Sequence, residues 1–158
     1  MTTSLPRGSR VGIDAGSVRI GVAASDPDGT MAFPAATVLA NETSVKEIIA
    51  IISERGANCV YVGSPISLTG GATQSTVMAH TLADEIAQAT KALDFLVDVQ
   101  LIDERLTTVS AASQLRDAGR NAKTSKAIVD QAAAVVILEQ ALDIEGRTGA
   151  RAGKPVGE

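Results

Sequence analysis

The first quarter of the chain consists of short apolar runs separated by turn residues. RVGIDA (10–15), RIGVAAS (19–25) and MAFPAATVL (31–39) have the length and composition of strands, and Gly- or Pro-containing turns separate them. Connections this short join antiparallel neighbours, so residues 10–39 predict a three-stranded meander.

The middle of the chain changes to alternating helix and strand. SVKEIIAIISER (44–55) has the apolar spacing of an amphipathic helix, with Ser44 and Glu47 in the positions of a capping box and Gly56 as the stop. Two buried strands are predicted, at NCVYVG (58–63) and FLVDVQLID (95–103), on either side of a helix over 74–92. In that helix the side chains expected to face inward are Val77, Leu82, Ile86 and Leu93.

The last third predicts a helix at about 108–118, then a final helix capped by Ser125 that ends near residue 143. The pattern favours an α/β layered fold with one domain over 10–144. Residues 1–9 and the Gly-rich, charged segment 145–158 are expected to be disordered.

Composition narrows the classes of function. A net charge of −4 argues against a generally basic nucleic-acid coat but permits a local basic patch. A single cysteine excludes a disulfide framework, and no apolar run is long enough to cross a bilayer. With one tyrosine, two phenylalanines and no tryptophan, base stacking on aromatic side chains is not the expected mode of nucleic-acid binding.

Acidic residues stand where the pattern favours apolar ones, or at strand ends. Asp14 lies in the first strand, Asp103 and Glu104 end the last one, and Asp130 interrupts the apolar run AIVDQAAAVVIL (127–138). An unpaired buried carboxylate costs several kcal/mol, so Asp130 needs a partner, a proton or a cation. Each acid alone has a simpler interpretation: Asp14 is a turn residue, and Asp103 and Glu104 are solvated turn residues. Asp130 pairs with a buried arginine or lies on an exposed stripe of its helix.

A shared cation site accounts for all of these positions at once. Oxygen ligands suit Mg²⁺ or Mn²⁺. His80 is the only histidine and is expected on a helix surface, so neither a zinc cluster nor Ser–His–Asp chemistry has enough residues.

Four motifs in this order resemble those of the YqgF/RuvX family, described as Holliday junction resolvases and as nucleases that mature the 5′ end of pre-16S ribosomal RNA. They are GIDAGSVRIGVAASD (12–26), VGSP (62–65), DERLTTVSA (103–111) and VDQAAAVVILE (129–139). The resemblance implies an RNase H-like fold with a mixed five-stranded sheet and helices on both faces. It also implies phosphodiester hydrolysis that depends on Mg²⁺ or Mn²⁺, in the bacterial cytoplasm.

Carried onto this sequence, the resemblance implies that Asp14, Glu104 and Asp130 hold the metal, with Asp103 as an alternative or a support for Glu104. Gly16 would allow close backbone approach. Contacts with nucleic acid are expected from the motif residues Arg19, Arg105, Thr107 and Thr108, of which one threonine could instead cap a helix. The segment RDAGRNAKTSK adds Arg116, Arg120, Lys123 and Lys126, which are expected to meet backbone phosphates unless they form a solvated face.

The substrate stays open at this point between structured RNA, including ribosomal precursor particles, and branched DNA. A junction-cutting enzyme would favour a homodimer. Whether cleavage is endo- or exonucleolytic is open as well. Two other classes are weighed: a phosphotransferase of the actin and sugar-kinase type, for which the chain lacks a second domain, and a non-catalytic binding module, against which the retained acids argue.

Overall fold

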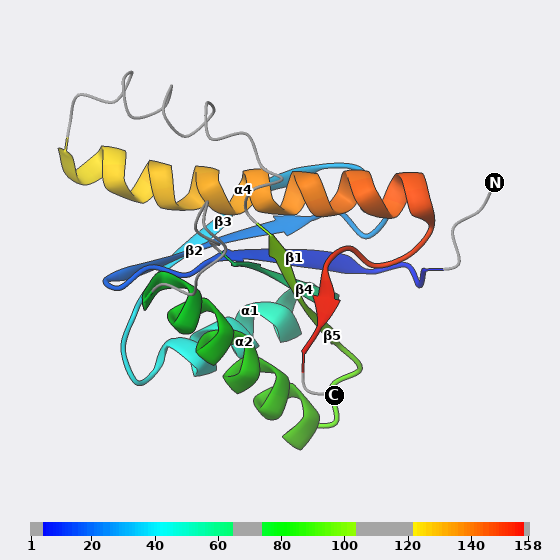
Figure 1. Ribbon diagram of the computed structural model, residues 1–158, viewed down its shortest axis with the longest axis horizontal. Coiled ribbons are helices and arrows are strands. Elements are labelled where there is room, and N and C mark those ends of the chain that lie inside the picture. The colour runs from blue at the N-terminus through cyan, green and yellow to red at the C-terminus, as the bar shows by residue number, and fades with distance from the viewer. Residues whose placement is uncertain (1–4, 65–73, 104–121, 157–158) are drawn as a thin grey trace.

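A computed structural model describes residues 5–64, 74–103 and 122–156 of the chain. Within these ranges a single mixed sheet is covered by helices on both faces (Figure 1). The elements in chain order are β1 (Ser9–Asp14), β2 (Arg19–Ser25), β3 (Ala32–Leu39), α1 (Ser44–Arg55), β4 (Ala57–Ser64), α2 (Gln74–Ala92), β5 (Asp98–Asp103), α4 (Ala122–Thr148) and β6 (Lys154–Pro155).

The sheet combines the predicted meander with a parallel half. Its strand order is β3-β2-β1-β4-β5-β6. β1, β2 and β3 pair antiparallel, as the short turns predicted, whereas β1, β4 and β5 run parallel because helices connect the last two to the preceding strands. The three parallel strands therefore end at the same edge of the sheet.

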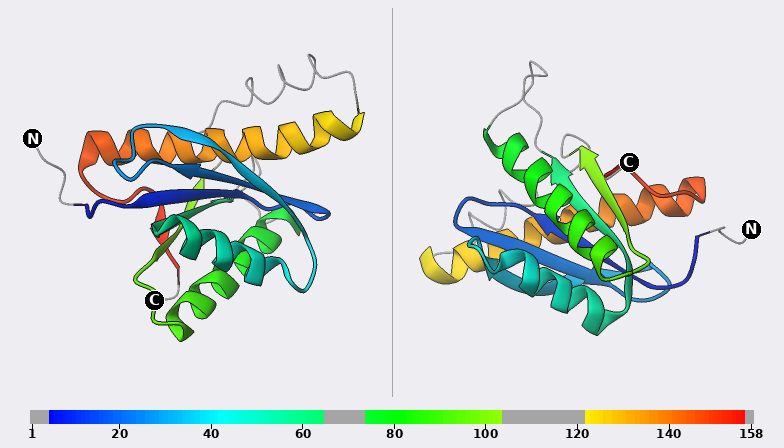
Figure 2. Two further views of the ribbon diagram at one scale, coloured as in Figure 1. Left: turned by 180° about the vertical axis from the view of Figure 1, so that it is seen from behind. Right: turned by 90° about the horizontal axis from the view of Figure 1, so that it is seen from below.

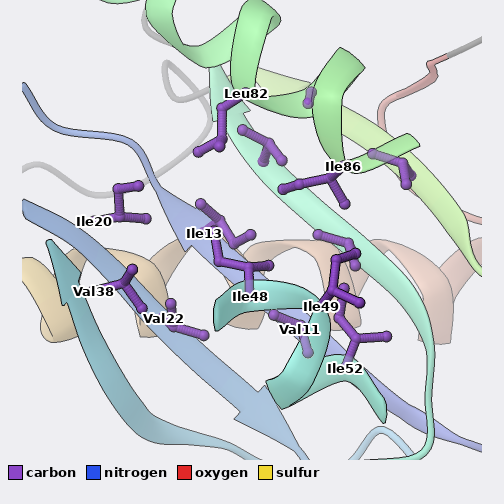
Figure 3. Packing of buried hydrophobic residues seen from close by; sticks show 14 of the residues in the cluster. Val11, Ile13, Ile20, Val22, Val38, Ile48, Ile49, Ile52, Leu82 and Ile86 are labelled. Carbon is purple, nitrogen blue, oxygen red and sulfur yellow. The ribbon is translucent and has the colours of Figure 1, made fainter. Parts of the chain in front are cut away.

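The two faces of the sheet are covered differently. α1 and α2 lie on one face, and α4 runs across the other (Figures 1 and 2). Figure 3 shows the core on the α1/α2 face, where Val11 and Ile13 of β1 meet Ile48 and Ile52 of α1 and Ile86 of α2. Because strand side chains alternate, Gly12, which lies between Val11 and Ile13, faces α4.

α4 packs closely against the sheet through small residues on its buried side. It has 27 residues, which corresponds to a length of about 40 Å. The small residues Ala134 and Ala141 lie on its buried side with Leu138, against Tyr61 and Ile102 of the sheet. Among the residues described, no helix has both the length and the apolar composition needed to span a membrane.

The predicted helices at 44–55, 74–92 and the end of the domain are present, but some of their caps and ends differ from the prediction. α1 ends as predicted at Gly56, which adopts the left-handed conformation with φ 62°. Its N-cap, however, is Thr43, and the Ser44 hydroxyl donates to the carbonyl of Asn41 instead. The helix predicted at 108–118 lies outside the described residues, and α4 extends beyond the range predicted for the final helix at both ends.

On α2, Leu82 and Ile86 are buried as predicted, but Val77 and Leu93 are 58% and 55% exposed. Val77 precedes Leu82 by five positions, or about 140° around the helix axis, so it lies outside the buried stripe. Leu93 follows the last residue of the helix. The prediction counted apolar positions without their angle around the helix axis, and therefore assigned too many residues to the buried face of α2.

Among the described residues, parts of the two terminal segments that were predicted to be disordered have regular structure. Ser9 already belongs to β1, and α4 continues to Thr148. Lys154 and Pro155 then pair antiparallel with β5 as a sixth strand, where five were predicted. Glycine-rich and charged, this segment has little apolar area of its own, so its order depends on contacts with the rest of the chain.

These contacts are made by a buried polar cluster, here called the clasp: Arg10, Tyr61, Glu145 and Arg151. The Glu145 carboxylate accepts from Arg10 Nε at 3.0 Å, from an Arg151 guanidinium nitrogen at 3.1 Å, and from the Tyr61 hydroxyl. The backbone N–H of Ala152 donates to the Tyr61 oxygen at 3.2 Å. Burial raises the pKa of Tyr61 far above its ordinary value, so its hydroxyl stays a donor. The clasp joins the end of α4 and the C-terminal segment to the start of β1.

Candidate active site

The carboxyl edge of the parallel strands carries the predicted strand-end acids. β1 ends at Asp14, β4 at Ser64 and β5 at Asp103. Ser64 is the register partner of Asp103. Because neighbouring strands are about 4.8 Å apart, the backbones of Asp14 and Asp103 lie about 10 Å from each other with β4 between them. This edge is where open α/β sheets bind their ligands.

Asp14 lies on the face of the sheet that α4 covers. A Cβ built on Gly12 would lie 2.7 Å from Leu138 Cβ and 2.9 Å from the carbonyl oxygen of Ala134. Asp14 follows Gly12 by two residues, so it shares that face. Its neighbour Gly16 closes the next turn tightly, since a Cβ there would lie 2.3 Å from the carbonyl oxygen of Arg19.

α4 crosses β1 in the opposite direction, which brings the turn that contains Asp130 toward Asp14. Glu145 contacts Arg10 at the start of β1, and Ala134 and Leu138 lie over Gly12. From Gly12 to Asp14 the strand advances by about 7 Å, and from Ala134 back to Asp130 the helix advances by about 6 Å in the same direction. Asp130 lies in α4, although its side chain is outside the described part of the structure.

Asp103 belongs to the other face. It is in phase with Val99 and Leu101, both of which pack against the core beneath α1 and α2. Its register partner Ser64 lies on that face too, where its hydroxyl is 3.1 Å from Nε2 of His80. Glu104 follows β5 and lies outside the described residues.

The donor set suits a hard divalent cation. Carboxylate oxygens are the preferred ligands of Mg²⁺ and Mn²⁺, and two of the three predicted acids come from segments that converge on one face. Among the residues that the structure describes, no three acidic, histidine or cysteine side chains are grouped to hold a metal. The third ligand expected from the sequence is Glu104.

Comparisons with known proteins decide the family. Residues 8–144 match the family model described as "RuvX: Holliday junction resolvase". The chain belongs to the RuvX family. RuvX relatives include candidate pre-16S rRNA nucleases from Leifsonia xyli subsp. xyli, 44% identical over 94% of both chains, and from Nocardioides sp., 44% identical over 96% of this chain and 97% of the relative. Membership of this family supports the nuclease activity that the sequence predicted.

Solved structures confirm the predicted fold. RuvC from Thermus thermophilus in complex with a Holliday junction substrate aligns with a TM-score of 0.57, covering 94% of this chain and 99% of that one. Sequence identity in this alignment is 15%, so the likeness concerns the fold. The RuvX chain therefore has the RNase H-like architecture of RuvC, with β6 as a sixth strand.

Most of the predicted nucleic-acid contacts lie outside the described residues. Arg19, at the start of β2, is half-buried close to the turn that follows Asp14. Lys123 and Lys126 belong to the first turns of α4, but their side chains are not described. Arg105, Thr107, Thr108, Arg116 and Arg120 fall within 104–121, and their roles stay predictions.

Two polar contacts near this edge were missed in the sequence. His80 is exposed, as expected, yet it pairs with Ser64. Gln131, beside Asp130, donates from Nε2 to the hydroxyl of Thr37 on β3 at 2.8 Å. Gln131 and Asp130 are the two polar residues in the apolar run 127–138, but the partner of Gln131 depends on the strand register and could not be named from the sequence.

Proposed function

We propose that this RuvX chain is a divalent-metal-dependent nuclease that hydrolyses phosphodiester bonds in the 5′ region of pre-16S ribosomal RNA. The observation that carries the proposal is the antiparallel crossing of β1 and α4, which brings the Asp130 turn to the end of the strand that bears Asp14. The pre-16S substrate is supported by the relatives, which match nearly the whole chain at more than 40% identity.

In this proposal Asp14, Glu104 and Asp130 hold Mg²⁺ or Mn²⁺. Bound ions of this kind supply Lewis acidity, which activates water and stabilises charge on the leaving oxygen. The three carboxylates fix the position of that charge, so no side-chain nucleophile is required. The alternation of β5 supports Glu104 over Asp103 as the ligand, because Asp103 is in phase with the face opposite to that of Asp14.

Contacts with the substrate backbone fall to Arg19, Arg105, Thr107, Thr108 and the basic segment that contains Arg116, Arg120, Lys123 and Lys126. Guanidinium, ammonium and hydroxyl groups bind phosphate oxygens without reading bases, so recognition would depend on the shape of the RNA. The partner would be a ribosomal precursor particle or its RNA, in the bacterial cytoplasm. Branched DNA remains the alternative substrate, as the description of the family model implies, and would favour a homodimer.

The experiment compares a 5′-extended 16S precursor RNA with a four-way DNA junction, each with Mn²⁺, Mg²⁺ or a chelator. We expect Mn²⁺ or Mg²⁺ to support RNA cleavage and the chelator to abolish it. Asp14→Asn, Glu104→Gln and Asp130→Asn should each lower the rate by about 100-fold or more, because several kcal/mol of charge stabilisation depend on the ions they hold.

Two control variants remove a carboxylate that is not a proposed metal ligand. They separate the effect of losing a ligand from the effect of losing a negative charge. Glu139 is an exposed acid on the same helix as Asp130, and Glu139→Gln should leave cleavage unchanged. Asp103→Asn should cost far less than Glu104→Gln. Cleavage at wild-type rate by Asp14→Asn or Asp130→Asn would refute the catalytic assignment, and preference for the DNA junction by a dimer would favour the alternative substrate.

A further inference from the structure

One hydrogen bond holds α4 to β3 beside the candidate active site. Gln131 Nε2 donates to Thr37 Oγ1 at 2.8 Å and joins residues 94 positions apart. Both side chains are partly buried. Gln131 directly follows Asp130 in α4.

The register of the meander places this bond in line with Asp14. Asp14 pairs with Gly21 on β2, and Gly21 pairs with Thr37 on β3. Asp14, Gly21 and Thr37 therefore form one row across three strands, with the backbones of Asp14 and Thr37 about 10 Å apart. Gly21, the residue between them, has no side chain. Gln131 thus fastens α4 to the row of the sheet to which Asp14 belongs.

The apolar contacts between α4 and the sheet near this point are less directional. Ala134 and Leu138 pack over Gly12, and such apolar contacts tolerate small rotations and translations of a helix. A hydrogen bond weakens steeply as its angle departs from linear, so it restricts the rotation of α4 about its own axis. Since Asp130 and Gln131 are adjacent in α4, fixing the rotation of the helix at Gln131 also fixes the position of the Asp130 backbone relative to the sheet.

We propose that Thr37 and Gln131 are positioning residues for the metal site, which set the rotation of α4 and so the place of Asp130 relative to Asp14. This inference rests on the proposed function. Residues that orient metal ligands typically change metal affinity or activity by 10–100-fold when they are replaced. The pair touches neither substrate nor metal in this proposal and acts only through α4.

The test uses variants of the full chain that remove or retain the hydrogen bond at nearly constant shape. Thr37→Val and Gln131→Met delete it, whereas Thr37→Ser keeps the hydroxyl. We expect the two deletions to lower kcat by about 10-fold or more, with little change in KM for the precursor RNA. Binding of Mn²⁺ alone, followed by electron paramagnetic resonance without substrate, should weaken similarly.

Thr37→Ser should restore both properties. The double variant Thr37→Val with Gln131→Met should be no worse than either single variant, because both remove the same bond.

A core variant at the other end of α4 separates positioning from stability. Leu142 belongs to the same face of α4, where it is 9% exposed, and Leu142→Ala should lower the melting temperature while kcat and Mn²⁺ affinity stay at wild-type values. Wild-type kcat and Mn²⁺ affinity in Thr37→Val and Gln131→Met would overturn the inference, as would equal losses in Leu142→Ala. If Asp130→Asn itself cleaves and binds Mn²⁺ normally, the proposed function fails instead.

Discussion

At the scale of single residues, Gly12 controls how closely α4 approaches the sheet. Its missing side chain leaves room for Leu138 Cβ and the carbonyl oxygen of Ala134, both of which would lie within 3 Å of a Cβ at this position. Backbone and Cβ atoms cannot rotate away from such a clash. A larger residue at position 12 must therefore move α4 or bend β1, two residues before Asp14.

Gly12→Ala should destabilise the fold by about 1–3 kcal/mol, the usual cost of adding an atom to a packed interior. It should also reduce nuclease activity, since α4 carries Asp130. Gly146→Ala is the matched control: it is a glycine within α4 that has no atom within 4 Å of a built Cβ, and it should stabilise by about 0.5–1 kcal/mol. Urea unfolding measures the change in the free energy of unfolding for both variants. A Gly12→Ala variant as stable as the wild type would contradict this account of the packing.

Some roles of single residues could be predicted from the sequence, and others could not. The difference was whether the role depends on which face of the sheet a strand residue occupies. Asp14 and Asp130 could be proposed as site residues because a carboxylate is costly in an apolar run, wherever the run lies in the fold. The choice between Asp103 and Glu104 stayed open because adjacent strand residues face opposite sides, and only the register to β4 shows that Asp103 lies in phase with Ser64.

At the scale of elements, the helices and strands over 9–103 follow the predicted pattern, whereas the C-terminal segment does not. The C-terminal segment was predicted to be disordered from its local composition. Composition does not show which distant residues Glu145 and Arg151 contact. Arg10 and Glu145 are 135 positions apart, and their side chains are 4% and 5% exposed. A buried pair of this separation orders a glycine-rich segment that could not order itself.

Truncation after Thr148 should therefore destabilise the domain, by about 3 kcal/mol, because it removes Arg151 from the clasp and leaves the buried Tyr61 oxygen without the Ala152 N–H. The clasp lies at the far end of α4 from Asp130, so the rate of cleavage at temperatures where the truncated chain is folded should be retained. Thermal unfolding and cleavage rate are measured together. Truncation after Val156 serves as the control, and equal stability of the two truncations would show that the clasp does not hold the segment.

At the scale of the whole molecule, α4 connects two ends with separate roles. One end lies beside the carboxyl edge of β1, β4 and β5, and the other carries the clasp over the start of β1. The order of strands and helices alone predicts the edge at which the candidate site is placed, because parallel strands end at the same edge of a sheet. The clasp could not be predicted in this way, since it depends on how the end of the chain returns to the sheet.

This polarity predicts which charges govern binding of nucleic acid. Lys123 and Arg147 lie 24 positions apart on α4, or about 36 Å, which is several times the distance over which physiological salt screens a charge. If the substrate lies at the Asp14 edge, phosphates come within reach of the basic segment at the start of α4 and not of the basic residues at the opposite edge.

Replacing Arg120 and Lys123 with alanine should weaken RNA binding and lower the slope of log affinity against log salt by about 1.5–2, one phosphate contact for each charge removed. The matched control removes the same charge elsewhere, with Lys91→Ala in the last turn of α2 and Arg147→Ala in the last turn of α4. Its slope should equal that of the wild type, because neither cation lies near the bound strand. Equal slopes for the two double variants would mean that the RNA is held by the general charge of the surface, and an unchanged slope for Arg120→Ala with Lys123→Ala would move the phosphate contacts to other residues.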